Sequence, residues 1–198
     1  VILAVITAVT VDASDRTDAL HAQGSDYTDA QNNGLAAEED AYDWHRVSFD
    51  DGRLSLLMPG EPVARTRSRS TIGGDVETDA YLVARPSGLR ASAAWTHLPT
   101  AAAIFASDKE ILKKARTHLL GQFNGTGANV ETVEQLGFKG SHLTYTAAGP
   151  EEGTTLTGEA LLLIKGRHLF VINTLTPSSH STGFAQKLFA SIAVARKK

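Results

Sequence analysis

The chain contains no cysteine and only one methionine, Met58, among its 198 residues. The absence of cysteine excludes disulfide scaffolds, cysteine-based zinc fingers, iron–sulfur clusters and thiol nucleophiles. It does not decide the cellular compartment. With 42% hydrophobic and 21% charged residues, the composition is that of an ordinary globular protein with about one domain.

Sequence signatures of catalysis are also missing. The chain has no Gly-x-Ser-x-Gly, no His-Glu-x-x-His, no phosphate-binding Gly-Lys-Ser/Thr loop and no EF-hand ligand pattern. No two of its seven histidines lie three to five residues apart, so we predict no metal site and no cofactor. Ser141-His142 and Ser179-His180 suggest a hydrolase only weakly, because neighbouring side chains on a strand point to opposite faces. We therefore expect a protein that is not an enzyme.

The net charge of −3 conceals two parts of opposite sign. Residues 12–43 hold one base, Arg16, against nine acids, a net charge of −8, whereas residues 44–198 hold 18 bases against 13 acids, a net charge of +5. A stretch of one charge sign with few large apolar residues is typical of a solvated arm or linker. The remaining residues, 44–198, are long enough for one sizeable core. Nucleic acid is not an expected partner, because aromatic residues do not interleave with the bases.

The first eleven residues are uncharged and almost entirely apolar. Three interpretations stay open for residues 1–11: the tail of a signal peptide, the outer half of a membrane anchor, or a buried β-strand. As a helix they would reach only about 16 Å, half of a bilayer core. The acidic flank that follows favours the non-cytoplasmic side of a membrane. As an anchor, the segment would contact a bilayer or a membrane partner through Val1, Ile2, Leu3, Val5 and Ile6.

Residues 44–198 predict an α+β domain with an antiparallel sheet. Strands are expected over residues 45–49, 53–58, 63–71, 77–85, 89–98, 130–135, 137–147, 155–164 and 168–176, the first five as a meander. Ser107 and Glu110 form a capping-box pattern that begins a helix ending before Gly125. A last helix is expected from about Ser181 to Arg196.

Three arginines alternate along one predicted strand. Arg65, Arg67 and Arg69 would share one face, since the side-chain period of a strand is two residues. One interpretation is a docking stripe for an acidic protein or phosphate surface. The other is an edge strand that its charges protect from unwanted pairing.

Three further segments resemble a known family. A strand ends in Met58-Pro-Gly-Glu-Pro62, residues 162–171 read Leu-Leu-Ile-Lys-Gly-Arg-His-Leu-Phe-Val, and residues 185–192 read Ala-Gln-Lys-Leu-Phe-Ala-Ser-Ile. Together they resemble poorly characterised exported bacterial proteins with a PsbP-like α/β/α sandwich, over about residues 44–194. The resemblance implies an antiparallel sheet covered by helices. It implies no catalytic residue, because PsbP is a non-enzymatic extrinsic subunit of photosystem II and its relatives commonly serve as accessory or assembly factors.

The leading functional hypothesis is therefore a non-enzymatic, extracytoplasmic accessory subunit that binds a larger membrane or envelope protein assembly. The apolar segment 1–11 and the arm 12–43 would tether the domain 44–198 to the lipid bilayer, and the three arginines would contact the assembly. The alternative is a solute-binding, lipoprotein-like domain with a pocket between sheet and helices. A hydrolase is the third hypothesis.

Overall fold

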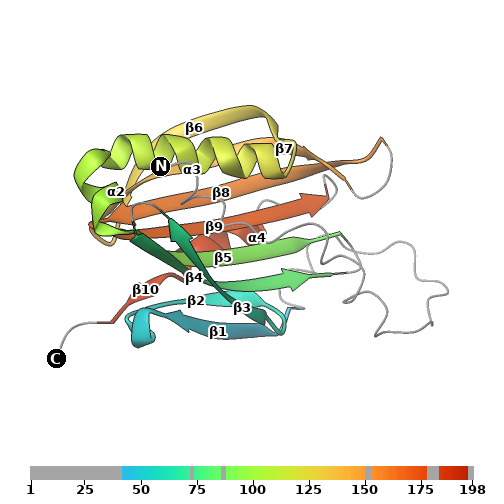
Figure 1. Cartoon of the computed structure of the whole chain (residues 1–198). Coiled ribbons are helices and arrows are strands. Elements are labelled where there is room, and N and C mark those ends of the chain that lie inside the picture. The colour runs from blue at the N-terminus through green and yellow to red at the C-terminus, as the bar shows by residue number, and fades with distance from the viewer. Residues whose placement is uncertain (1–41, 72–73, 86–87, 150–152, 178–182, 196–198) are drawn as a thin grey trace, which may run out of the picture.

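The computed structural model of this chain describes residues 42–71, 74–85, 88–149, 153–177 and 183–195. The predicted apolar segment 1–11 and residues 12–41 of the predicted acidic arm lie outside these ranges. Within them, the chain forms two antiparallel sheets, one of seven strands and one of three, with helices packed on the larger sheet (Figure 1).

The larger sheet has the strand order β3-β4-β5-β9-β8-β7-β6, and the smaller has the order β1-β2-β10. The strands are β1 (Trp44–Phe49), β2 (Leu54–Pro59), β3 (Val63–Thr71), β4 (Gly74–Ala84), β5 (Arg90–His97), β6 (Thr126–Gln135), β7 (Phe138–Ala148), β8 (Thr155–Lys165), β9 (His168–Pro177) and β10 (Ala193–Val194). The helices are α2 (Thr100–Phe105), α3 (Asp108–Gln122) and α4 (Gly183–Ala190), and a 3-10 turn, η3 (Asp50–Gly52), joins β1 to β2.

One face of the larger sheet is covered by α3. The predicted capping box is confirmed: the Ser107 hydroxyl accepts the backbone N–H of Glu110, and the Glu110 carboxylate accepts the N–H of Ser107. The apolar stripe of the helix, with Ile111, Ala115 and Leu119, is buried in a core with side chains of β7, β8 and β9. The short helix α2, which the sequence patterns did not predict, precedes α3.

The opposite face is covered by the smaller sheet and α4. Leu56 and Met58 of β2 are fully buried, in one cluster with Phe170 and Ile172 of β9 and Leu188 of α4. Figure 1 shows α3 and the β1-β2-β10 sheet on opposite sides of the seven strands. The predicted α+β class with an antiparallel sheet is confirmed, but the second covering layer combines strands with a helix.

The predicted five-strand meander is divided between the two sheets. β1 and β2 pair with each other in the smaller sheet, and β3, β4 and β5 form consecutive hairpins in the larger one. The chain changes sheet at Gly60, which has a φ of +104°. A positive φ favours glycine at this position, because side chains with a Cβ atom rarely adopt it.

The last helix is shorter than predicted. It ends at Ala190, where Ser191 donates its hydroxyl to the Leu188 carbonyl at 2.6 Å and accepts the Leu57 N–H at 2.9 Å. Residues Ala193–Val194 then pair with β2. The helix therefore ends earlier than predicted, because the backbone groups of Ala193 and Val194 hydrogen-bond to β2 and not within a further helical turn.

The buried cluster around Phe170 predicts a large effect of truncation. Phe170 is fully buried and lies edge-to-face with Phe49, their ring centroids 5.3 Å apart. Phe170→Ala should lower the free energy of unfolding by about 3–5 kcal/mol, because it removes buried surface and leaves a cavity between the sheets. Urea denaturation measures this. Val63→Ala, at a side chain that is 48% exposed, is the control and should change stability by less than about 0.5 kcal/mol. Equal effects of the two variants would contradict the assigned core.

Candidate functional site

The three predicted arginines come together on the edge strand of the larger sheet. β3 pairs with β4 on one side only, and all its residues except Thr71 are exposed. Arg65, Arg67 and Arg69 stand opposite Ala80, Thr78 and Val76, so they share one face of the β3–β4 pair. Val76 belongs to the core under α3, which places the arginines on the α3 side. We call Arg65, Arg67 and Arg69 the basic stripe.

The carboxylates of β4 lie on the opposite face of this strand pair. Asp75, Glu77 and Asp79 stand opposite the hydroxyl residues of β3. Two of them accept hydrogen bonds there, from the Ser70 hydroxyl at 2.6 Å and from the Thr66 hydroxyl at 2.8 Å. Bases and acids are therefore segregated by face, and the cross-strand neighbours of the basic stripe carry no charge.

An edge strand also leaves backbone groups without a strand partner. In an antiparallel pair, the outer side of the last strand presents alternate N–H and C=O groups. One β3 carbonyl, that of Ala64, accepts a hydrogen bond from the Arg65 guanidinium at 3.4 Å. β3 thus offers a row of positive charge beside backbone that can pair with a further strand. The docking and the edge-protection interpretations of the stripe both require this placement.

The apolar contact residues of the sequence prediction cannot be placed. Val1, Ile2, Leu3, Val5 and Ile6 lie outside the described residues. In the part of the chain that the structure describes, no helix is long and apolar enough to cross a membrane.

The serine–histidine neighbours do not converge where they can be placed. Ser141 stands opposite Leu162, which belongs to the core under α3, and His142 stands opposite Leu161, which belongs to the core under the smaller sheet. Their side chains therefore lie on opposite faces of β7, as strand alternation predicts. The second pair, 179–180, lies outside the described residues.

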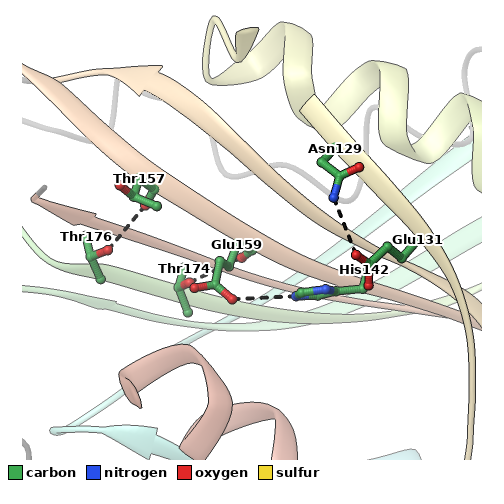
Figure 2. Close-up of polar contacts among 7 residues, drawn as sticks. All are labelled: Asn129, Glu131, His142, Thr157, Glu159, Thr174 and Thr176. Carbon is green, nitrogen blue, oxygen red and sulfur yellow. Dashed lines mark hydrogen bonds and ion pairs between the residues drawn. The ribbon is translucent and has the colours of Figure 1, made fainter. Parts of the chain in front are cut away.

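The sequence patterns did not predict a row of polar side chains across β6 to β9. We call its members the polar row: Glu131, His142, Glu159 and Thr174 (Figure 2). Figure 2 shows His142 of β7 pointing to Glu159 of β8, with 3.5 Å between Nε2 and Oε2. Both side chains are partly buried, and the His142 ring meets the Phe189 ring of α4 edge-on at 5.8 Å. Nearby, Asn129 donates to Glu131 at 3.4 Å. The row can hydrogen-bond a polar partner.

This polar row does not form a metal site in the structure. Among the described residues, no group of three or more histidine, cysteine, aspartate or glutamate side chains lies close enough to hold a metal ion. The sequence signal for the row was weak, because polar residues at alternate positions of a strand are typical of any solvated face. Only the register of β7 against β8 brings His142 beside Glu159.

Two histidines meet at the other end of the sheet. His97 and His168 stand opposite each other on β5 and β9, with ring centroids 4.9 Å apart, and Trp95 stacks on His168 at 4.8 Å. The His168 Nδ1 atom is buried and has no hydrogen-bond partner among the described residues. Burial, and then the facing His97, lower the pKa of His168, while Asp50 opposes them weakly.

The lowered pKa of His168 predicts an acid-sensitive fold. The unfolded chain binds a proton at this histidine more readily than the folded chain, so stability is full above the ordinary histidine pKa of about 6.5 and falls as the pH drops through the folded pKa. Thermal unfolding between pH 7.5 and 5 should show a loss of stability that His168→Gln reduces.

Some dependence should remain in His168→Gln, since burial lowers the pKa of His118 as well. Identical profiles for the parent chain and His168→Gln would contradict the assignment.

Comparisons with known proteins give likenesses of fold. No protein-family model and no curated protein sequence matches the chain. Among solved structures, cyanobacterial PsbP from Synechocystis is similar, with 12% identity and a TM-score of 0.48, over 84% of this chain and 98% of that protein. A Pseudomonas aeruginosa protein of unknown function is similar at 13% identity and a TM-score of 0.41, over 78% and 99%. A Bacteroides thetaiotaomicron protein is similar at 14% identity and a TM-score of 0.43, over 77% of this chain but only 48% of that protein.

The PsbP likeness inferred from three sequence segments thus recurs among the solved structures that this chain resembles. The chain spans about half the length of the Bacteroides protein. These likenesses concern the course of the chain.

Proposed function

We propose that this chain is a non-enzymatic accessory subunit that binds an acidic, extended segment of a larger membrane or envelope protein assembly along β3. The single observation that carries the proposal is the basic stripe on an exposed edge strand, with the carboxylates of β4 turned to the other face. The assembly partner is defined by this chemistry: an extended backbone and acidic side chains at alternate positions.

Strand addition is the binding mode that this edge favours. A partner strand would pair with the outward backbone groups of β3, and its alternate side chains would face the arginines. Successive arginines of the stripe are spaced by two residues, about 7 Å along a strand. Acidic residues at the same spacing therefore meet all three guanidiniums, whereas a folded acidic surface would not use the backbone.

The position of the basic stripe relative to the two cores supports the accessory role. Both spaces between the layers are filled by buried apolar side chains, such as Leu162 under α3 and Phe170 under the smaller sheet. The basic stripe lies outside both cores. The location that we propose, extracytoplasmic and tethered to the membrane through residues 1–11, is supported by the apolar and acidic character of the N-terminal sequence.

Solute binding is the second candidate, and one observation favours it. His142 and Glu159 form a partly buried polar contact on the sheet face next to α4, where a small polar ligand could replace one partner. Titration of the chain with the small-molecule fraction of its native cells, followed by the His142 ring resonances, tests this alternative. Unchanged resonances would leave it without support.

The basic stripe predicts how binding responds to charge removal. The triple variant Arg65→Gln, Arg67→Gln and Arg69→Gln should bind an alternating (Glu-Ser)4 peptide about 3- to 150-fold more weakly than the parent chain. That range corresponds to three exposed ion pairs of about 0.2–1 kcal/mol each. Calorimetric titration at low salt measures the affinity, and about 1 M salt should weaken binding by the parent chain because it screens exposed charges.

The matched control removes the same number of charges from α3. Lys109, Lys113 and Arg116 lie on this helix, whose opposite stripe is buried. Their replacement by glutamine should leave peptide affinity within about twofold of the parent chain. Equal weakening by both triple variants would indicate a response to net charge alone, and no binding by the parent chain at any salt concentration would overturn the proposed function.

A further inference from the structure

We propose that the acidic arm of this chain, residues 12–43, is itself a ligand of β3 and occupies the basic stripe until a partner displaces it. The arm carries a net charge of −8 and the stripe carries three positive charges. Two observations support this contact: the opposite charges of the arm and the stripe, and the position at which the arm joins the domain. Its regulatory consequence, competition with the assembly partner, rests on the proposed function.

The arm joins the domain at the end of the sheet where β3 begins. The carbonyl of Asp43 accepts the N–H of Gly60 at 2.7 Å, which extends the β1–β2 pairing beyond Trp44 and Pro59. β3 starts three residues after Gly60, at Val63. β1 runs antiparallel to β2, and β3 runs back in the direction of β1 (Figure 1). An arm that lay antiparallel to β3 would therefore turn once before Trp44, beside the turn that joins β2 to β3.

The most acidic part of the arm lies close to this junction. Glu38, Glu39 and Asp40 precede Asp43 by only three to five residues. An extended chain covers about 3.4 Å per residue, so Glu38 extends at most about 17 Å from Asp43, a length that matches the five residues from Gly60 to Arg65, the first arginine of the stripe. Glu38 and Asp40 are two residues apart, the spacing of neighbouring arginines in the stripe. In an added strand, these two carboxylates would share the face of the basic stripe.

Covalent connection favours this contact over the same contact between separate molecules. A segment linked to its binding site has an effective concentration in the millimolar range for short connections. A contact whose dissociation constant is about 1 mM or lower is then formed at least half of the time. A free acidic partner must compete with the arm, and its apparent affinity is reduced by the fraction of chains whose edge is unoccupied.

The absence of cysteine gives a direct experiment on the full chain. A nitroxide attached to Ser68→Cys, on the exposed centre of β3, broadens the amide signals of residues that lie near it. If the arm lies along β3, broadening should rise from Asp43 to a maximum near residues 36–40 and fall again toward residue 12. If the arm leaves the domain elsewhere, broadening should fall continuously from Asp43, and this result would overturn the inference.

Charge variants decide whether the stripe causes the contact. Glu38→Gln with Asp40→Asn should abolish the maximum, and so should the triple glutamine variant of the stripe. Asp12→Asn with Asp15→Asn, the matched control, removes two charges far from the junction and should retain it. A maximum that survives loss of the stripe contradicts the inference. A maximum that also arises between isotope-labelled and spin-labelled copies in a mixture indicates contact between two chains and likewise overturns it.

Peptide competition separates this inference from the proposed function. If the arm occupies the edge about nine-tenths of the time, the Glu38→Gln, Asp40→Asn variant should bind (Glu-Ser)4 about tenfold more tightly than the parent chain. Equal affinities, with binding that still depends on the stripe, would overturn the arm contact and leave the proposed function standing. A broadening maximum without peptide binding by either chain would leave the arm contact standing and overturn the proposed function.

Discussion

The structure depends on a seven-stranded sheet that buries both of its faces but cannot close its two edges. α3 covers one face, and the smaller sheet with α4 covers the other. An open sheet always has two strands with a partner on one side only. At one edge, β3 also extends beyond the cover of both layers, because eight of its nine residues are exposed. Water and binding partners, and not the cores, therefore determine which side chains β3 can carry.

Strand alternation then separates the charges of this edge. An edge that only needed protection from pairing would be served by charges of either sign on either face. Here Arg65, Arg67 and Arg69 share one face, and Asp75 and Asp79 accept hydroxyl groups on the other. The β4 residues directly opposite the three arginines are therefore uncharged. The largest group of acids in the sequence is the arm of charge −8, so the net charge of −3 is the sum of two parts of opposite sign.

Local sequence patterns predicted most of the strands and helices. Contacts between residues far apart in the sequence determined which strands lie side by side and where α4 ends. The capping box at Ser107 and the alternation of the basic stripe depend on neighbours in sequence, and both could be predicted. The meeting of His97 with His168 requires β5 to lie beside β9, strands that are 71 residues apart at this pair. The end of α4 likewise depends on β2, because Ser191 bonds to Leu57. No short sequence window contains such information.

The residues that stabilise the fold are different from those of the basic stripe. β3 contributes no side chain to either buried core, whereas its neighbour β4 contributes Val76 to one and Val83 to the other. Substitutions on the exposed face of β3 therefore remove charge without creating a cavity, and β4 holds the strand in place through backbone pairing. The His142–Glu159 pair differs, because it is partly buried and lies next to α4. A change there alters a polar contact and the packing of the helix together, whereas a change in the basic stripe alters the charge of the edge and leaves both cores intact.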